Sequence, residues 1–268
     1  MPAIRVAVAG LGAIGRAVAR RLASGMPGFE LTAVSAKDEG KAREWLASEK
    51  IKCPVAALPD LSRYADVAVE CAPAALLEQV CRPMLEAGKK VIVVSAAGLI
   101  RNHDLIELAE ARGGQIIVPT GALIGLDAVT AAAEGKIRSV RLITRKPPAS
   151  LAGAPYLEQH GVSVEGITEP RRVFAGSARE AATGFPANMN VAAALALAGI
   201  GPERTTVEIW ADPGVTRNCH TIDVDADSAH FTMAIQNIPS ENAKTGRITA
   251  LSVLAALKKL NAPLRIGT

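Results

Sequence analysis

The sequence predicts an α/β protein with two domains, the first built on a parallel sheet and the second on a mostly antiparallel or mixed sheet. Over about residues 1–120, short apolar and β-branched runs alternate with helical patterns, which is typical of βαβ units. Further along, candidate strands follow one another at short spacing, which favours a mixed or antiparallel sheet. The length of 268 residues fits two modest domains at roughly 150 residues each.

The first domain is expected to span residues 1–120. Its first strand, at 4–9, is a continuous apolar run, as a strand buried on both faces requires. A glycine turn follows, and then a helix with apolar residues at 14, 17, 18 and 22. The other predicted strands are 30–35, 67–71, 89–95 and 115–119, and the other predicted helices are 39–48, 74–87 and 103–112.

The second domain is expected to span residues 121–240. Residues 137–145 alternate as a half-exposed strand does, a Pro/Gly-rich stretch follows, and a helix is predicted at 187–198. Three further strands are predicted at 205–211, 217–225 and 228–236. The last helix, at 245–260, is apolar almost all round and needs burial on several sides, so we expect residues 241–268 to pack back on the first domain.

Composition excludes several classes of protein. The net charge of +4 is spread along the chain and aromatic residues make up only 3%, so a nucleic-acid partner is not expected. No apolar run approaches the roughly 18 residues of a membrane span. The four cysteines form no CxxC pair, which favours thiols in a reducing cytoplasm. No metal site is expected, because HxxxH, HExxH and Cys/His clusters are missing from the sequence.

Residues 10–15 read GLGAIG, a G-x-G-x-x-G pattern between a predicted strand and a predicted helix. Gly10 would permit the tight turn, Gly12 would let the backbone approach a pyrophosphate, and Gly15 would let helix and strand pack closely. The helix start at Ala13 and Ile14 would offer unpaired N–H groups to phosphate. The pattern predicts a Rossmann-type, dinucleotide-binding domain, with a purely structural glycine turn as the alternative.

The choice between NAD and NADP stays open. An NAD site usually has a carboxylate about 20 residues after the loop, where it accepts the ribose 2′-hydroxyl. Here Ser35-Ala36-Lys37-Asp38 stands at that place, without a carboxylate at the strand end itself. Ser35 and Lys37 would suit a 2′-phosphate, whereas Asp38 would suit a 2′-hydroxyl, and Lys37 fits a solvated loop charge equally well.

His220 is the candidate for acid–base chemistry. It lies in a strand-like alternating run, and a neutral imidazole can move protons near pH 7. The alternative is a structural histidine held by hydrogen bonds. The other three histidines, His103, His160 and His230, are interpreted as structural.

Two predicted helix starts also carry polar residues. Asn188 and Asn190 begin one helix, where capping is the alternative role. Lys244 and Thr245 precede the last helix, whose N-terminus could hold a carboxylate, with a capped start and a solvated lysine as the alternative. Asn190, Lys244 and Thr245 are the candidates for substrate binding. Three other cations could pair with substrate carboxylates, although each fits a surface charge better: Arg145, Lys146 and Arg217.

Taken in order, six segments of the chain resemble the L-aspartate dehydrogenase family. They are GLGAIG, VPTGALIGLDA, TRKPP, FPANMNVAAALALAG, RNCHTI and NIPSENAKTGRITALSVLAAL, and they run nearly from end to end. The chain departs from the family pattern at Ala243, where a proline is usual. That difference concerns the rigidity of a helix start and not the chemistry.

The resemblance implies an oxidoreductase that uses NAD or NADP to interconvert L-aspartate with iminoaspartate, or with oxaloacetate and ammonia. It implies that Ala122 and Asn188 contact the cofactor and that His220 is catalytic. As a hypothesis for the mechanism, His220 would be the acid and base that activates the water adding to the imine. The expected partners are these small molecules and further copies of the chain in a homodimer or homotetramer. Synthesis of an NAD precursor, aspartate breakdown and ammonia assimilation would all use the same site.

Two other functions stay open from the sequence. One is a related reductase of the dihydrodipicolinate reductase or homoserine dehydrogenase type, which a substrate panel with NADH and NADPH separates. The other is a non-catalytic dinucleotide sensor, which has no evident need for His220, Asn188 and the segment SENAKTGR together.

Overall fold

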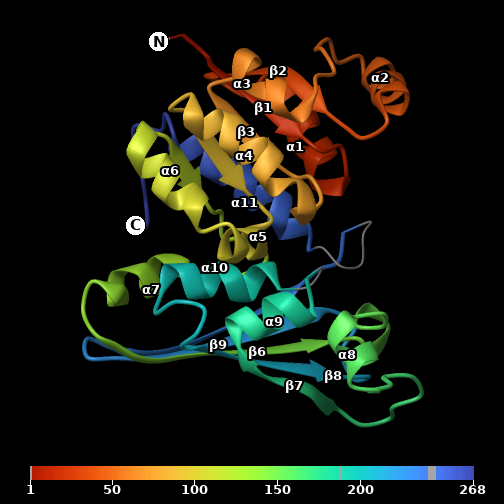
Figure 1. Cartoon of the computed structure of the whole chain (residues 1–268), viewed down its shortest axis with the longest axis vertical. Coiled ribbons are helices and arrows are strands. Elements are labelled where there is room, and N and C mark those ends of the chain that lie inside the picture. Colours follow the sequence, from red (N-terminus) through yellow and green to blue (C-terminus); the bar gives the residue numbers. More distant parts are fainter. Residues whose placement is uncertain (1, 187–188, 241–245) are drawn as a thin grey trace. The chain divides into compact units, whose positions relative to one another are not determined.

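A computed structural model describes residues 2–186, 189–240 and 246–268 and divides the chain into two compact units. Unit 1 comprises Met1–Pro119 and Ala250–Leu264, and unit 2 comprises Thr120–Thr249 and Arg265–Thr268. Each unit is built on one five-stranded sheet, sheet A in unit 1 and sheet B in unit 2 (Figure 1).

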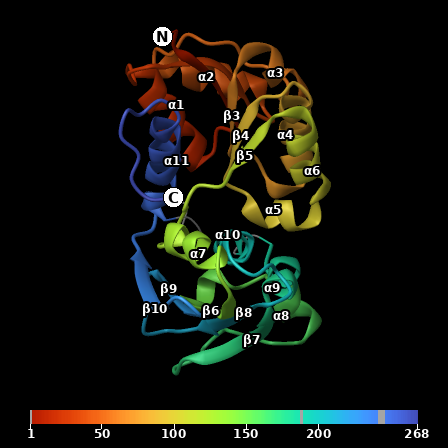
Figure 2. The same cartoon turned by 90° about the vertical axis from the view of Figure 1, so that its left-hand side faces the viewer.

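Sheet A is parallel throughout, with strand order β2-β1-β3-β4-β5. Its strands are β1 (Ile4–Ala9), β2 (Phe29–Ser35), β3 (Val67–Glu70), β4 (Lys90–Val93) and β5 (Gln115–Ile117). The helices of unit 1 are α1 (Ala13–Ala23), α2 (Glu39–Ser48), α3 (Leu61–Tyr64), α4 (Leu77–Glu86), α5 (Ala96–Arg101), α6 (Asp104–Arg112) and most of α11 (Arg247–Lys259), with single 3₁₀ turns at Leu58–Asp60 and Ala74–Leu76. Helices α1 and α11 lie on one face of sheet A, and α4 and α6 lie on the other (Figure 2). The predicted Rossmann-type parallel sheet is therefore confirmed.

The last helix contributes directly to the core of unit 1. Val253 and Leu257 of α11 are fully buried among apolar side chains of β1, β3 and α1. Burial on several sides, expected from the apolar sequence, is however wrong for part of this helix. Ile248 and Leu251 are exposed, Leu251 by 62%, so α11 buries one stripe as an ordinary amphipathic helix does.

Sheet B is mixed, with strand order β10-β9-β6-β8-β7, as predicted for the second part of the chain. Its strands are β6 (Ile137–Lys146), β7 (Arg171–Ser177), β8 (Thr205–Ala211), β9 (Asn218–Ala226) and β10 (His230–Asn237). Strands β6 and β8 pair in parallel, and the other pairs are antiparallel. Strand β7 has no clean alternation because its register shifts between Arg172 and Phe174, which explains why the pattern did not predict it.

The helices of unit 2 are α7 (Leu126–Ala133), α8 (Pro155–Gln159), α9 (Ala178–Gly184) and α10 (Asn190–Ala198), with a 3₁₀ turn at Pro148–Ser150. Helices α7, α9 and α10 cover one face of sheet B, and no described helix covers the other (Figure 1). The strands therefore bury every second residue, and the buried row of β9 runs from Asn218 to Ala226. Across the described ranges, no helix is both long and apolar enough to traverse a lipid bilayer.

Candidate dinucleotide-binding and acid–base sites

The glycine loop between β1 and α1 is shaped by two close backbone contacts. Gly10 has φ +100°, and a Cβ there would lie 2.5 Å from the carbonyl oxygen of Cys71. A Cβ on Gly15 would overlap the carbonyl oxygen of Gly10 and approach Val8. Gly10 and Gly15 are thus required by the protein itself, for the turn and for close packing of helix on strand.

Gly12 differs because nothing in the protein requires a glycine there. It has an ordinary φ of −74°, and no atom lies within 4 Å of the position of a Cβ. It caps α1 without a side-chain hydrogen bond, and no acidic residue stands in the first turn. The N–H groups of Ala13, Ile14 and Gly15 have no acceptor within the helix. This open, donor-rich space fits a dinucleotide pyrophosphate.

Glu70 is a buried carboxyl group beside this loop that sequence reasoning missed. It ends β3, and both its oxygens accept hydrogen bonds from Ser95, from the backbone N at 2.9 Å and from Oγ at 3.1 Å. Burial raises the pKa of Glu70 to about 7, against the opposing effect of the Ser95 hydrogen bonds. The signal in the sequence was an acidic residue closing the apolar run VAVE. Glu70 connects the carboxyl ends of β3 and β4.

In unit 2, five buried polar side chains lie on three neighbouring strands of sheet B. This sheet-B polar cluster comprises Thr144 and Lys146 of β6, Asn218 and His220 of β9, and Asn237 of β10. Thr144 stands opposite His220, and Asn218 opposite Asn237. Because alternate residues share a face, all five belong to the row that continues into the apolar core.

His220 is held by Thr144. The hydroxyl Oγ1 of Thr144 and Nδ1 of His220 are 2.8 Å apart, and both residues are almost fully buried. Burial lowers the pKa of His220 to about 3, and the nearby charge of Lys146 adds to the effect. The imidazole is therefore neutral near pH 7, and Nε2 is the ring nitrogen left to face a substrate.

Two carbonyl oxygens in the cluster have no hydrogen-bond donor within the described part of the chain. They are Oδ1 of Asn218 and Oδ1 of Asn237. Nδ2 of Asn237 donates to the carbonyl oxygen of Ala122 at 2.9 Å, which identifies Oδ1 as the free acceptor. Buried acceptors without a donor are costly, and an ammonium or amide group from a ligand would satisfy them.

Some predicted site residues are placed by the structure and others are not. Asn188, Lys244 and Thr245 lie outside the described residues. Asn190 is the first residue of α10 and half-buried, and Ala122 is linked to the cluster through Asn237. The described residues bring together no group of His, Cys, Asp and Glu that could hold a metal ion.

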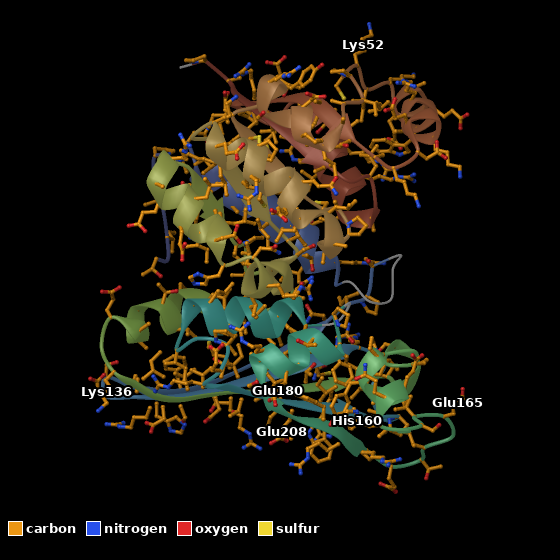
Figure 3. All side chains as sticks on the ribbon, in the orientation of Figure 1. Lys52, Lys136, His160, Glu165, Glu180 and Glu208 are labelled. Carbon is orange, nitrogen blue, oxygen red and sulfur yellow. The ribbon has the colours of Figure 1, made fainter. Side chains whose placement is uncertain are left out.

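The structure separates Lys146 from Arg145, two cations for which the sequence favoured a surface charge. Lys146 is only 3% exposed and belongs to the polar cluster, so the surface interpretation is wrong for it. Arg145, its neighbour, points to the other face, where it pairs with Asp212 at 3.2 Å and lies over the ring of Trp210. Figure 3 shows Glu208, which pairs with Arg141, on the same sheet. Because side chains alternate along β6, Arg145 and Lys146 point to opposite faces of sheet B.

A parallel sheet with an open glycine loop that would suit a phosphate, followed by a unit with a buried neutral histidine, is typical of a nicotinamide-dinucleotide-dependent oxidoreductase. Comparisons with known proteins agree with this class. Residues 10–119 match the family model described as homoserine dehydrogenase, NAD binding domain, and residues 127–260 match that described as aspartate dehydrogenase, C-terminal.

The chain is 57% identical to L-aspartate dehydrogenase 3 of Bordetella bronchiseptica, over 98% of this chain and 97% of that protein. It is 53% identical to L-aspartate dehydrogenase of Bradyrhizobium diazoefficiens, over 99% of this chain and 94% of that protein. The crystal structure of aspartate dehydrogenase from Thermotoga maritima has the same fold, with a TM-score of 0.74 at 21% identity, over 98% of this chain and 99% of that one. The chain belongs to the aspartate dehydrogenase family.

Proposed function

We propose that this protein is an L-aspartate dehydrogenase that uses NAD or NADP to interconvert L-aspartate with iminoaspartate, or with oxaloacetate and ammonia. The observation that carries the proposal is the 57% identity, over nearly the whole chain, to a relative of that name. The match of residues 127–260 to an aspartate dehydrogenase model favours this activity over the dihydrodipicolinate reductase and homoserine dehydrogenase alternatives. A dinucleotide sensor would have no use for the buried polar cluster.

Residues 1–120, together with the helix of 241–268, would form the dinucleotide-binding domain, and residues 121–240 the substrate and oligomerisation domain. The backbone of Gly10, Gly12, Ala13, Ile14 and Gly15 would hold the pyrophosphate, as the open space at Gly12 supports. A bound nicotinamide would accept the hydride from Cα of L-aspartate. The family resemblance assigns further cofactor contacts to Ala122 and Asn188.

His220 would then act on the imine. With Nδ1–H donating to Thr144, Nε2 carries the lone pair and takes a proton from the water whose oxygen adds to the imine carbon. The proton passes to the nitrogen and gives the carbinolamine. The hydroxyl proton of the carbinolamine then moves to the same nitrogen by way of His220 as the C–N bond breaks and the C=O bond forms, and oxaloacetate and ammonia are released. In the reverse direction, His220 returns the proton to the departing oxygen. Burial, with a smaller contribution from the charge of Lys146, lowers the pKa of His220 and keeps the resting imidazole neutral.

Aspartate carries two carboxylates and one amino group, and the polar cluster offers matching chemistry. Lys146 is a buried cation suited to one carboxylate, and the unsatisfied oxygens of Asn218 and Asn237 suit the amino group. Asn190, Lys244 and Thr245 are proposed for the second carboxylate. Replacing Lys244 or Thr245 should raise KM for aspartate and leave dinucleotide affinity unchanged.

The test is a substrate panel with NADH and NADPH, combined with the variant His220→Ala. We expect turnover of oxaloacetate with ammonia, and none of the substrates of the two alternative reductases. His220→Ala should bind dinucleotide normally and lose about 10²–10⁴-fold in kcat. Turnover within about threefold of the wild type would remove His220 from the mechanism.

Small-molecule partners follow from the family, and self-association is part of the proposal. The helix-free face of sheet B would pair across a two-fold axis in a homodimer or homotetramer in the cytoplasm. Sedimentation equilibrium tests this directly, since a monomer at micromolar concentration would contradict it.

A further inference from the structure

The carboxyl end of β2 lies beside the glycine loop. The backbone N of Gly10 donates to the carbonyl oxygen of Ser35, the last residue of β2, at 2.8 Å. In doubly wound dinucleotide folds this strand end meets the adenosine ribose. A carboxylate there accepts the 2′-hydroxyl of NAD, and a cation there accepts the 2′-phosphate of NADP. The charges near this end therefore decide which dinucleotide is bound.

Asp38, the first carboxylate after the end of β2, is already engaged. Asp38 caps α2, and its Oδ1 accepts a hydrogen bond from the backbone N of Lys41 at 3.0 Å. Its Oδ2 lies 3.4 Å from Nζ of Lys41, and these contacts lower the pKa of Asp38. If the side chain of Asp38 turned toward a ribose, α2 would lose this capping hydrogen bond. Because Lys41 and the helix N-terminus offset its charge, Asp38 also repels a phosphate only weakly.

Two exposed cations flank this end of the sheet. Lys37 lies two residues after the end of β2. Arg16 lies early in α1, where its Nε donates to the carbonyl oxygen of Leu11 in the glycine loop at 3.0 Å. The guanidinium carbon of Arg16 lies 5.4 Å from the ring centre of Trp45 in α2, so Arg16 is on the side of α1 that faces α2.

Neither cation is held in an ion pair, although Arg16 adds to the effect of Arg20 in lowering the pKa of Glu49. Within residues 2–186, 189–240 and 246–268, no carboxylate forms an ion pair with Arg16 or Lys37. Arg20, one turn further along α1, instead pairs with Glu49 at 2.6 Å. Unpaired arginine and lysine side chains beside a phosphate-accepting loop are the groups that bind a further phosphate.

We propose that Arg16 and Lys37 bind the 2′-phosphate of NADP(H), and that this chain therefore binds NADP(H) more tightly than NAD(H). The inference rests on the proposed function for its use of a dinucleotide, and it specifies which dinucleotide. Arg16 presents the N–H groups that its bond to Leu11 leaves available, and Lys37 adds a second charge from the strand end. Asp38 stays on α2.

The test measures binding without any aspartate. Isothermal titration calorimetry of the full chain compares 2′,5′-ADP, which carries the 2′-phosphate, with ADP, which lacks it. We expect 2′,5′-ADP to bind at least about tenfold more tightly, with an advantage that shrinks as salt concentration rises. Arg16→Ala and Lys37→Ala should each remove most of this advantage and leave ADP affinity within about twofold.

Two control variants sharpen the result. Lys52→Ala removes the same charge from the same unit at an exposed side chain that points into solvent, and it should change neither affinity (Figure 3). Asp38→Asn keeps a good helix cap and removes the carboxylate, so NADH and ADP affinity should not fall.

Equal affinity for the two nucleotides, no binding of either, or a fall in NADH affinity in Asp38→Asn would each overturn the proposal. Turnover of oxaloacetate with ammonia is measured separately with NADPH and NADH. A chain that selects 2′,5′-ADP but does not turn over these substrates would refute the aspartate dehydrogenase function and leave the 2′-phosphate site standing.

Discussion

The contact between Thr144 and His220 can be tested by removing one hydroxyl group. In Thr144→Val the side chain keeps its shape, but Nδ1 of His220 loses a partner at 2.8 Å in a place closed to water. A buried donor without an acceptor costs about 1–3 kcal/mol. Because the reactive tautomer needs Nδ1–H to donate to Thr144, its population should fall by a similar free energy.

That free energy corresponds to a decrease of roughly tenfold to a hundredfold in kcat, at about 1.4 kcal/mol per factor of ten. Steady-state kinetics should show the decrease in kcat with KM for aspartate and dinucleotide affinity nearly unchanged. Thr144→Ser keeps the hydroxyl and should restore most of the activity. Urea unfolding should show a loss of about 1–3 kcal/mol for the valine variant.

Thr205→Val is the matched control. Thr205 is also fully buried in sheet B, and its Oγ1 donates to the carbonyl oxygen of Gly201 at 2.9 Å. The control should lose comparable stability and no activity. If Thr144→Val kept kcat within about threefold of the wild type while losing the same stability, Thr144 would be structural only and would not position His220.

The remaining predictions concern pH and the glycine loop. Since the pKa of His220 falls from 6.5 to about 3 on folding, the unfolding free energy should decrease as pH drops through this window, by about 5 kcal/mol relative to His220→Gln. Glu70 has the opposite sign, because its folded pKa of about 7 exceeds 4.5. The stability that Glu70 contributes is present below pH 4.5 and is lost as pH rises through 7. The free energy of unfolding of Glu70→Gln, measured in urea titrations, should therefore rise by about 3 kcal/mol relative to the wild type between low pH and pH 8. Gly12→Ala should unfold within about 0.5 kcal/mol of wild type yet bind NADH at least tenfold more weakly, whereas Gly15→Ala should be strongly destabilised. Normal NADH binding by Gly12→Ala would exclude the loop as the phosphate site.

The strands of sheet A were predictable because each is a short, continuous apolar run bounded by turns. Their periodicity is local, so one sequence contains it. Strand β7 was not predictable, since the shift between Arg172 and Phe174 breaks its alternation. Helix α7 begins after Gly125 in an αL conformation and has no side-chain cap to mark its start.

The site was predictable only in part for a related reason. His220 and the glycine loop are recognisable within single segments. The partnership of His220 with Thr144 depends on strand register between segments 76 residues apart, which spacing along the chain does not reveal. The burial of Lys146 likewise depends on which face of β6 the helices cover, and the cap formed by Asp38 becomes visible only once α2 is placed.

The path of the chain through unit 1 has a consequence for synthesis. Val253 and Leu257, which complete the core around sheet A, are translated after the whole of residues 120–249. Domains usually fold in the order in which they leave the ribosome. Here the first unit to emerge is completed last, because its core includes side chains of the C-terminal helix. A chain truncated before residue 250 would therefore lack Val253 and Leu257 from the core of unit 1.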